Sequence, residues 1–217
     1  MKISILCTNK LHPVYPKLMK WCKDRKYIHD VELMESTNTL SGGDLLFLIS
    51  CNEVVNKDVR SKYRFCLVIH ASDLPKGRGW SPHIWQILEG ANNIPVMLLE
   101  AADGVDTGKV WAKDELKLEG HELFDEINEK LFAIELRLMD YAVKHLDAIV
   151  PYEQNGTTTY YRKRTPKDSR LDPTKTIAEQ FELLRVADPE RYSAYFDYRG
   201  YRYKVVLSKQ GKVVEEK

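Results

Sequence analysis

Short apolar runs alternate with longer amphipathic segments along the first two thirds of the chain. Apolar runs of this length, partly β-branched, are typical of strands buried on both faces of a parallel sheet. They occupy residues 2–7, 28–33, 44–50, 66–69 and 94–99, with a return strand expected near residues 109–112. We therefore expect an α/β fold with a Rossmann-like, mostly parallel sheet flanked by helices.

Two of the intervening segments have the spacing of helices. Residues 15–25 place Leu18, Trp21 and Cys22 on one helical face. Residues 121–145 repeat apolar side chains at three- and four-residue spacing, which makes a stripe that can pack on the sheet. The members of this stripe are Leu123, Ile127, Leu131, Ile134, Leu138 and Met139. No function is needed to explain them.

The composition changes after Pro151, where a small C-terminal α+β extension is expected. An Asn155-Gly156 turn stands between strand-like pieces, and residues 177–187 favour a helix. Alternating residues around Arg199-Gly200 predict a hairpin, and residues 209–217 predict a charged, frayed tail. The expected organisation is a catalytic core at residues 1–150 and an extension at residues 151–217.

Composition and charge restrict the class of protein. The chain has 217 residues and a net charge of +1, which gives no general attraction to nucleic acid. Its four cysteines are scattered, so we expect reduced core residues, no disulfide framework and no metal site. The first apolar run is too short for a signal peptide, and no run approaches the roughly 20 residues that span a bilayer. We expect a cytoplasmic enzyme without a membrane partner.

Candidate chemistry concentrates between Cys66 and Val110. His70 stands at the carboxyl end of a predicted strand, the edge at which open α/β sheets collect ligands. Asp106 lies in a tight turn rich in glycine, after a second predicted strand. No GxGxxG sequence is present, so a Rossmann-like sheet here does not imply a dinucleotide.

The order of short motifs resembles one enzyme family. HxSxLP at residues 70–75 is followed by Arg78-Gly79, then by a proline and a tryptophan, and by GxDTG at residues 104–108. This series resembles the formyltransferases that use 10-formyltetrahydrofolate, over about residues 44–140. The resemblance implies that His70 and Asp106 are catalytic.

One position departs from that family. The family usually has an asparagine two residues before the histidine, and it donates a hydrogen bond to the developing oxyanion; this chain has Val68 there. Loss of one such donor costs roughly a hundredfold to a thousandfold in rate. Asn52 is our candidate replacement, because it follows a central predicted strand and should lie at the same sheet edge.

The resemblance also implies two binding regions. The donor's pterin would lie against backbone groups after the third strand and in the loop before Asp106, and the acceptor against the loop after His70. An ordinary turn, packed tryptophans and an exposed arginine explain the same residues without a ligand. The donor residues are Asn52, Glu53, Val54, Val55, Ala101, Ala102 and Asp103, and the acceptor residues are Arg78, Gly79, Trp80 and His83.

The C-terminal region bears on the acceptor. The phrases RTPKDSRLD, LLRVADPERY and FDYRGYRYKV are similar to the tails of sugar N-formyltransferases, most of all the pseudaminic-acid-pathway type. That similarity implies a nucleotide-linked dideoxyamino sugar, such as UDP-4-amino-4,6-dideoxy-L-AltNAc, and a role in surface polysaccharide biosynthesis. Tyr160, Tyr161, Arg162 and Arg164 could then stack a base and pair with a pyrophosphate, although a solvated edge strand explains them equally.

Other acceptors and another class of protein stay open. A methionyl-tRNA formyltransferase would carry a larger basic C-terminal domain, and a glycinamide ribonucleotide transformylase would have little after the core. Val68 also suits a folate- or sugar-nucleotide-binding protein that has lost catalysis. A homodimer is compatible with the sequence.

Overall fold

The computed structural model describes residues 1–213 and contains a six-stranded sheet. Its strands lie in the order β2 (Asp30–Met34), β1 (Lys2–Leu6), β3 (Gly43–Leu48), β4 (Tyr63–His70), β6 (Asn93–Glu100) and β7 (Val110–Lys117). The first four run parallel, whereas β6 is antiparallel to both β4 and β7. The predicted mostly parallel, Rossmann-like sheet is confirmed.

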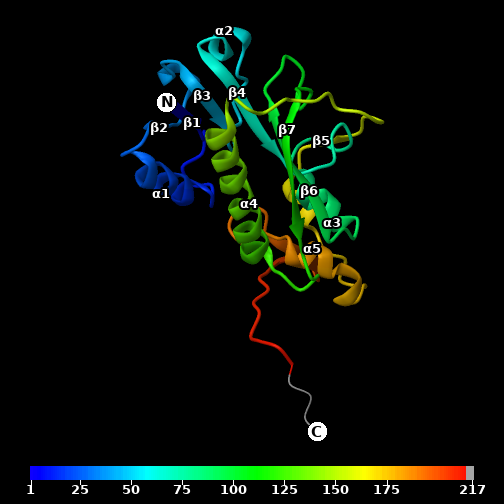
Figure 1. Cartoon of the computed structure of the whole chain (residues 1–217). Coiled ribbons are helices and arrows are strands. Elements are labelled where there is room, and N and C mark those ends of the chain that lie inside the picture. Colours follow the sequence, from blue (N-terminus) through cyan, green and yellow to red (C-terminus); the bar gives the residue numbers. More distant parts are fainter. Residues whose placement is uncertain (214–217) are drawn as a thin grey trace.

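Two helices cover one face of this sheet, as Figure 1 shows. α4 (Phe124–His145) crosses the strands, and α1 (Tyr15–Arg25) lies beside it. Their apolar stripes, including Leu18 and Leu131, join the main core with alternate residues of the central strands, such as Phe47 and Leu98. The predicted helical stripes therefore do face the sheet.

Shorter elements cover the other face and the strand ends. A smaller cluster forms around Leu46, Val55 and Cys66, beside the one-turn helix α2 (Lys57–Arg60), which the sequence analysis missed. α3 (Pro82–Leu88) begins at Pro82, since the fixed φ of proline suits the first turn of a helix. The turn η1 (Thr37–Thr39) lies between β2 and β3.

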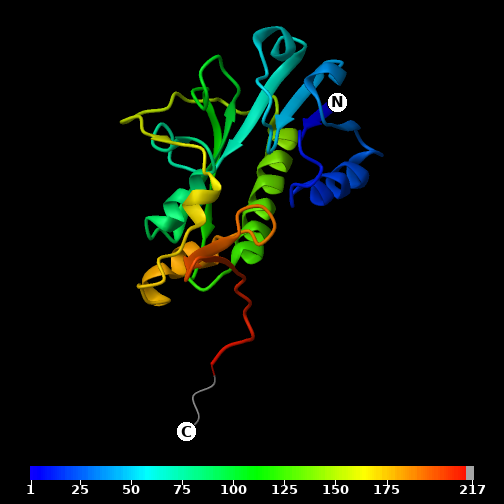
Figure 2. The same ribbon diagram turned by 180° about the vertical axis from the view of Figure 1, so that it is seen from behind.

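The extension runs back over the sheet and then folds below it (Figure 2). Its strand β8 (Tyr160–Tyr161) pairs in parallel with β5 (Arg78–Gly79), and Tyr152 bridges Val110. The strand-like pieces flanking Asn155-Gly156 therefore pair with the core and not with each other.

The end of the extension is the small α+β unit that was expected. The turn η2 (Pro166–Ser169) leads to η3 (Ala178–Gln180) and α5 (Phe181–Arg185), so the predicted helix is split and shorter. β9 (Ala194–Tyr198) and β10 (Tyr201–Val205) form the predicted hairpin around Arg199-Gly200.

Two further expectations concern the ends and divisions of the chain. Residues 206–213 carry no helix or strand, and Lys209 contacts Glu126 and His121; the rest of the predicted tail, residues 214–217, lies outside the described part. No helix within residues 1–213 is long and apolar enough to cross a membrane. The division at residue 150 stays a prediction.

Candidate active site

A cavity of about 1030 Å³ lies at the carboxyl ends of β3 and β4. Its wall includes His70, Asp106, Asn52 and every other residue predicted for either binding region except Arg78. The loops that follow β1, β3, β4 and β6 supply most of this wall, while α4 and the extension supply the rest. Tertiary structure thus gathers side chains that are far apart in the sequence.

His70 and Asp106 face each other in this cavity. His70 Nδ1 lies 3.5 Å from Asp106 Oδ2, and the two side chains are 6% and 9% exposed. Nε2 of His70 lies 2.8 Å from the carbonyl oxygen of Gly77. Because a carbonyl oxygen only accepts hydrogen bonds, Nε2 carries the proton, and Nδ1 is the nitrogen able to exchange a proton beside Asp106.

The turn that holds Asp106 is tightly fixed. Asp106 has a φ of 54°, unusual for a residue with a side chain, and its Oδ2 accepts from the backbone N–H of Gly79 at 2.9 Å. A Cβ at Gly108 would lie 1.8 Å from the carbonyl oxygen of Glu100, so only glycine fits there. The GxDTG motif therefore sets the backbone conformation of this turn and also supplies its carboxylate.

The extension reinforces the same turn. Gln154 Nε2 donates to the carbonyl oxygens of Asp106 and Gly108 at 2.8 and 2.9 Å, and its Oε1 accepts from Arg78 at 2.6 Å. Arg78 thus contacts Gln154 and is not part of the cavity wall, contrary to its expected place facing the acceptor. Sequence reasoning had no signal for Gln154, because only the fold brings it to Asp106.

The predicted donor residues line one part of the cavity. Val55 is 7% exposed and packs in the core, whereas Val54 is 91% exposed. Glu53 accepts from the backbone and the hydroxyl of Thr37 at 2.9 and 2.7 Å, which lowers the pKa of its carboxyl. Asp103 pairs with Arg60. This part of the wall thus joins apolar surface with fixed polar groups.

The remaining predicted acceptor residues are a partly exposed tryptophan, a neutral histidine and a glycine packed against the extension. Trp80 is 42% exposed, and the ammonium of Lys163 lies 4.5 Å from its ring centroid. Burial lowers the pKa of His83 to about 4, with His12 and His70 nearby, so His83 is neutral at pH 7. A Cβ at Gly79 would lie 2.4 Å from the carbonyl oxygen of Tyr161, which fixes the loop after His70 against the extension.

Val68 presents only apolar surface to the cavity. It packs with Leu74, Met97 and Leu99, and it cannot donate a hydrogen bond. Asn52 also lines the cavity, and its backbone N–H donates to Thr8 Oγ1 at 2.9 Å. Its role as the replacement donor stays a prediction.

Two polar residues of α4 were missed by the sequence analysis. Asn128 and Glu135 both line the cavity, and Asn128 Nδ2 and Glu135 Oε2 are buried without a hydrogen-bond partner. They lie two helical turns apart on the helix face that also carries Leu131. Two polar positions interrupting an apolar stripe were the available signal. Such unpaired groups are costly unless a ligand meets them.

Comparisons with known proteins agree with this site. The Formyl transferase family model matches residues 14–143, more than half of the chain. Methionyl-tRNA formyltransferase from Rickettsia prowazekii is 29% identical over 157 residues, which are 71% of this chain and 52% of that protein. The chain therefore spans about half the length of the curated relatives it matches.

Solved structures share the fold. Methionyl-tRNA formyltransferase from Clostridium thermocellum has a TM-score of 0.82 at 20% identity, covering 97% of this chain and 94% of that one. A sugar N-formyltransferase from Shewanella has a TM-score of 0.73 at 13% identity, covering 98% and 99%. HypX from Aquifex aeolicus, solved with tetrahydrofolic acid, has a TM-score of 0.77 at 19% identity, covering 95% and 37%.

The family model, the shared fold and the facing histidine and aspartate agree with one another. The formyl transferase family uses 10-formyltetrahydrofolate as its formyl donor. This chain belongs to the formyl transferase family.

Proposed function

We propose that this protein transfers a formyl group from 10-formyltetrahydrofolate to the amino group of a nucleotide-linked dideoxyamino sugar. The observation that carries the proposal is the His70–Asp106 pair, 3.5 Å apart in a cavity of about 1030 Å³. A neutral amine attacks the formyl carbon, the C–N bond to the donor breaks, and one proton moves from the amine to the released nitrogen.

His70 and Asp106 supply what this reaction needs. Asp106 accepts the amine's proton, directly or through water. His70, in the form that holds a proton on Nδ1 as well as on Nε2, donates from Nδ1 to the formyl oxygen as negative charge develops there. Gly77 fixes the imidazole through Nε2, and Gly79 fixes the carboxylate through its backbone N–H. Both groups are thereby held in place before the substrates bind.

The donor fits the part of the cavity around residues 52–55 and 101–103. A flat pterin needs apolar walls with hydrogen-bonding groups at its edge, and Val55, Val68 and Leu99 provide apolar surface there. HypX, which shares the fold, was solved with tetrahydrofolic acid. Asn52 would donate to the oxyanion in place of the residue absent at Val68.

The other part of the cavity suits a polar acceptor. Asn128, Glu135, His12 and Arg164 line it, and an amino sugar offers hydroxyl groups that can pair with such side chains. A sugar N-formyltransferase matches over nearly the full length of both chains. Among such acceptors, the tail phrases favour UDP-4-amino-4,6-dideoxy-L-AltNAc.

A formyl-transfer assay with a panel of amino-sugar nucleotides tests the proposal. We expect tetrahydrofolate to appear only when an acceptor is present, with His70→Ala and Asp106→Asn both inactive but folded by circular dichroism. Binding of donor and acceptor without turnover would show instead a protein that has lost catalysis.

Methionyl-tRNA is the second candidate acceptor, because relatives of this chain are methionyl-tRNA formyltransferases. Methionyl-tRNA belongs in the same acceptor panel. Formylation of methionyl-tRNA, with binding that weakens steeply as salt rises, would replace the sugar by a tRNA acceptor.

A further inference from the structure

Arg164 is a buried cation without an anion. Its side chain lines the cavity from the extension, and the residue is only 7% exposed. One guanidinium nitrogen, Nη2, donates to the carbonyl oxygen of Asp168 at 3.2 Å and to Ser169 Oγ at 3.3 Å. Its Nε is buried without a partner, and within the described part of the chain Arg164 forms no ion pair.

This state is energetically unusual. Arginine stays charged in proteins, and burying a charge is costly unless it is paired and hydrogen-bonded. Arg162, two residues earlier, shows the ordinary arrangement: it is 62% exposed and forms an ion pair with Asp168. The carboxylate nearest in sequence is therefore engaged by the other arginine, and Arg164 remains available for a ligand.

The surroundings of Arg164 favour a phosphate-containing ligand. Lys163, its neighbour in sequence, lines the same cavity and adds an ammonium. Arg191 also lines it but is paired with Asp188, so its charge is already balanced. A guanidinium fork and an adjacent ammonium match the two charged groups of a diphosphate.

We propose that Arg164, with Lys163, is the diphosphate-binding site for the acceptor of this enzyme. The inference rests on the proposed function, because it places the nucleotide part of the acceptor against the extension and its amino sugar toward His70 and Asp106. The donor, at residues 52–55 and 101–103, does not contact Arg164 in this arrangement.

Titration calorimetry of the full chain at fixed salt tests the site without any turnover. The probes are UDP, inorganic pyrophosphate, uridine and 5-formyltetrahydrofolate. We expect UDP and pyrophosphate to bind the wild type and uridine to bind much more weakly. Arg164→Gln should weaken UDP and pyrophosphate by about tenfold to a hundredfold, the range for a hydrogen bond to a charged group. Binding of 5-formyltetrahydrofolate should not change.

Arg170→Gln is the matched control, since it removes a nearby arginine that is exposed, paired with Asp197 and not part of the cavity wall. Its affinity for UDP should equal that of the wild type. Arg164→Lys keeps the charge but loses the planar fork, so we expect its affinity for UDP to lie between those of the wild type and Arg164→Gln. Arg164→Lys replaces Arg164→Gln in the test if Arg164→Gln does not fold.

The outcomes separate this inference from the proposed function. Equal UDP affinity in the wild type and Arg164→Gln, or an equal loss in Arg170→Gln, overturns the diphosphate site even if sugar formylation is found. Arg164-dependent UDP binding without any sugar formylation overturns the proposed function and keeps the site. Arg164-dependent binding of tRNA that UDP does not displace would assign the cation to an RNA phosphate and overturn the inference.

Discussion

At the residue scale, we expect Val68 and Asn52 to determine how the developing oxyanion is stabilised. Val68 offers only methyl groups to the cavity, whereas Asn52, which also lines it, has a carboxamide. A hydrogen-bond donor at the oxyanion is worth roughly a hundredfold to a thousandfold in rate. The chain therefore needs a second donor besides His70 if it is an efficient catalyst.

Paired substitutions at these two positions test the replacement. We expect Asn52→Ala to lower kcat about a hundredfold, because one oxyanion donor is lost. Adding Val68→Asn to Asn52→Ala should recover part of that loss, as measured by steady-state formyl transfer. Asn128→Ala, which removes the unpaired amide of α4, is the control and should raise the KM of the acceptor with a smaller effect on kcat. If Asn52→Ala keeps the wild-type rate, another group supplies the donor.

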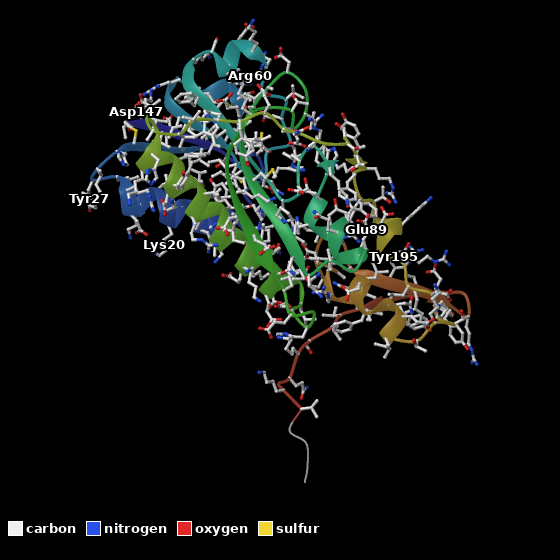
Figure 3. The ribbon with its side chains drawn as sticks, turned by 45° about the vertical axis from the view of Figure 1, so that its right-hand side comes forward. Lys20, Tyr27, Arg60, Glu89, Asp147 and Tyr195 are labelled. Atoms are coloured by element: carbon white, nitrogen blue, oxygen red, sulfur yellow. The ribbon has the colours of Figure 1, made fainter. Side chains whose placement is uncertain are left out.

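At the scale of elements, the extension contributes to the candidate active site. β8 pairs with β5, Tyr161 donates to Glu89 at 2.7 Å, and Gln154 bonds the turn that carries Asp106. In the view of Figure 3, Glu89, which follows α3, and Tyr195, on β9 of the extension, are labelled toward the opposite end of the molecule from Arg60. The contact of Tyr161 with the loop after His70 explains why Gly77 and Gly79 in that loop cannot carry side chains.

Gln154 is therefore expected to be a positioning residue. Gln154→Ala removes the bonds to the carbonyl oxygens of Asp106 and Gly108, so Asp106 should leave its strained backbone conformation more often. We expect kcat to fall about tenfold, with the donor's KM nearly unchanged, since small misplacements of catalytic groups are costly in rate.

Gln154→Glu and Glu153→Ala sharpen this test. Gln154→Glu keeps the acceptor for Arg78 but has no N–H for the two carbonyls, so it should resemble Gln154→Ala. Glu153→Ala removes only an exposed partner of Lys109 and should leave the kinetics unchanged. A rise in the donor's KM with unchanged kcat would contradict a positioning role.

At the scale of the whole molecule, the cavity weakens the fold in a pH-dependent way. Burial raises the pKa of Glu135 to about 8, and its Oε2 has no partner. The folded protein thus holds a proton that the unfolded chain, with an ordinary pKa of about 4.5, releases. Stability from this group is present below pH 4.5 and is lost as pH rises through about 8.

Urea unfolding at pH 5 and pH 9 measures this loss. Glu135→Gln, which cannot ionise, should be more stable than the wild type at pH 9 by a few kcal/mol, on the order expected for such a pKa shift, and nearly equal at pH 5. Glu129→Gln on the same helix is the control, because Glu129 is exposed and paired with Lys17. If the stability of the wild type and of Glu135→Gln depended on pH in the same way, groups other than Glu135 would cause the loss.

Burial of the histidines acts in the opposite direction. Burial lowers the pKa of both His12 and His83 to about 4. Between pH 6.5 and 4, therefore, these two side chains bind protons in the unfolded chain but not in the folded protein. Stability should therefore fall as pH drops through that range. His83→Phe should lose less stability than the wild type between pH 7 and pH 4.5, as measured by urea unfolding at both pH values.

The sequence by itself determined the sheet, its long helices and the two residues of the facing pair. Apolar runs and helical stripes depend on local periodicity, and the motifs around His70 and Asp106 are strict because backbone contacts at Gly79 and Gly108 exclude any side chain. These features can be predicted because the constraint acts on neighbouring residues.

Only the tertiary structure decided what surrounds that pair. It reversed β6 relative to β4, moved Arg78 from the expected acceptor site to Gln154, and paired the extension with β5. It also left Asn128, Glu135 and Arg164 with unpaired polar atoms at one cavity. The physical reason is that burial and pairing depend on partners distant in sequence, which no local pattern records.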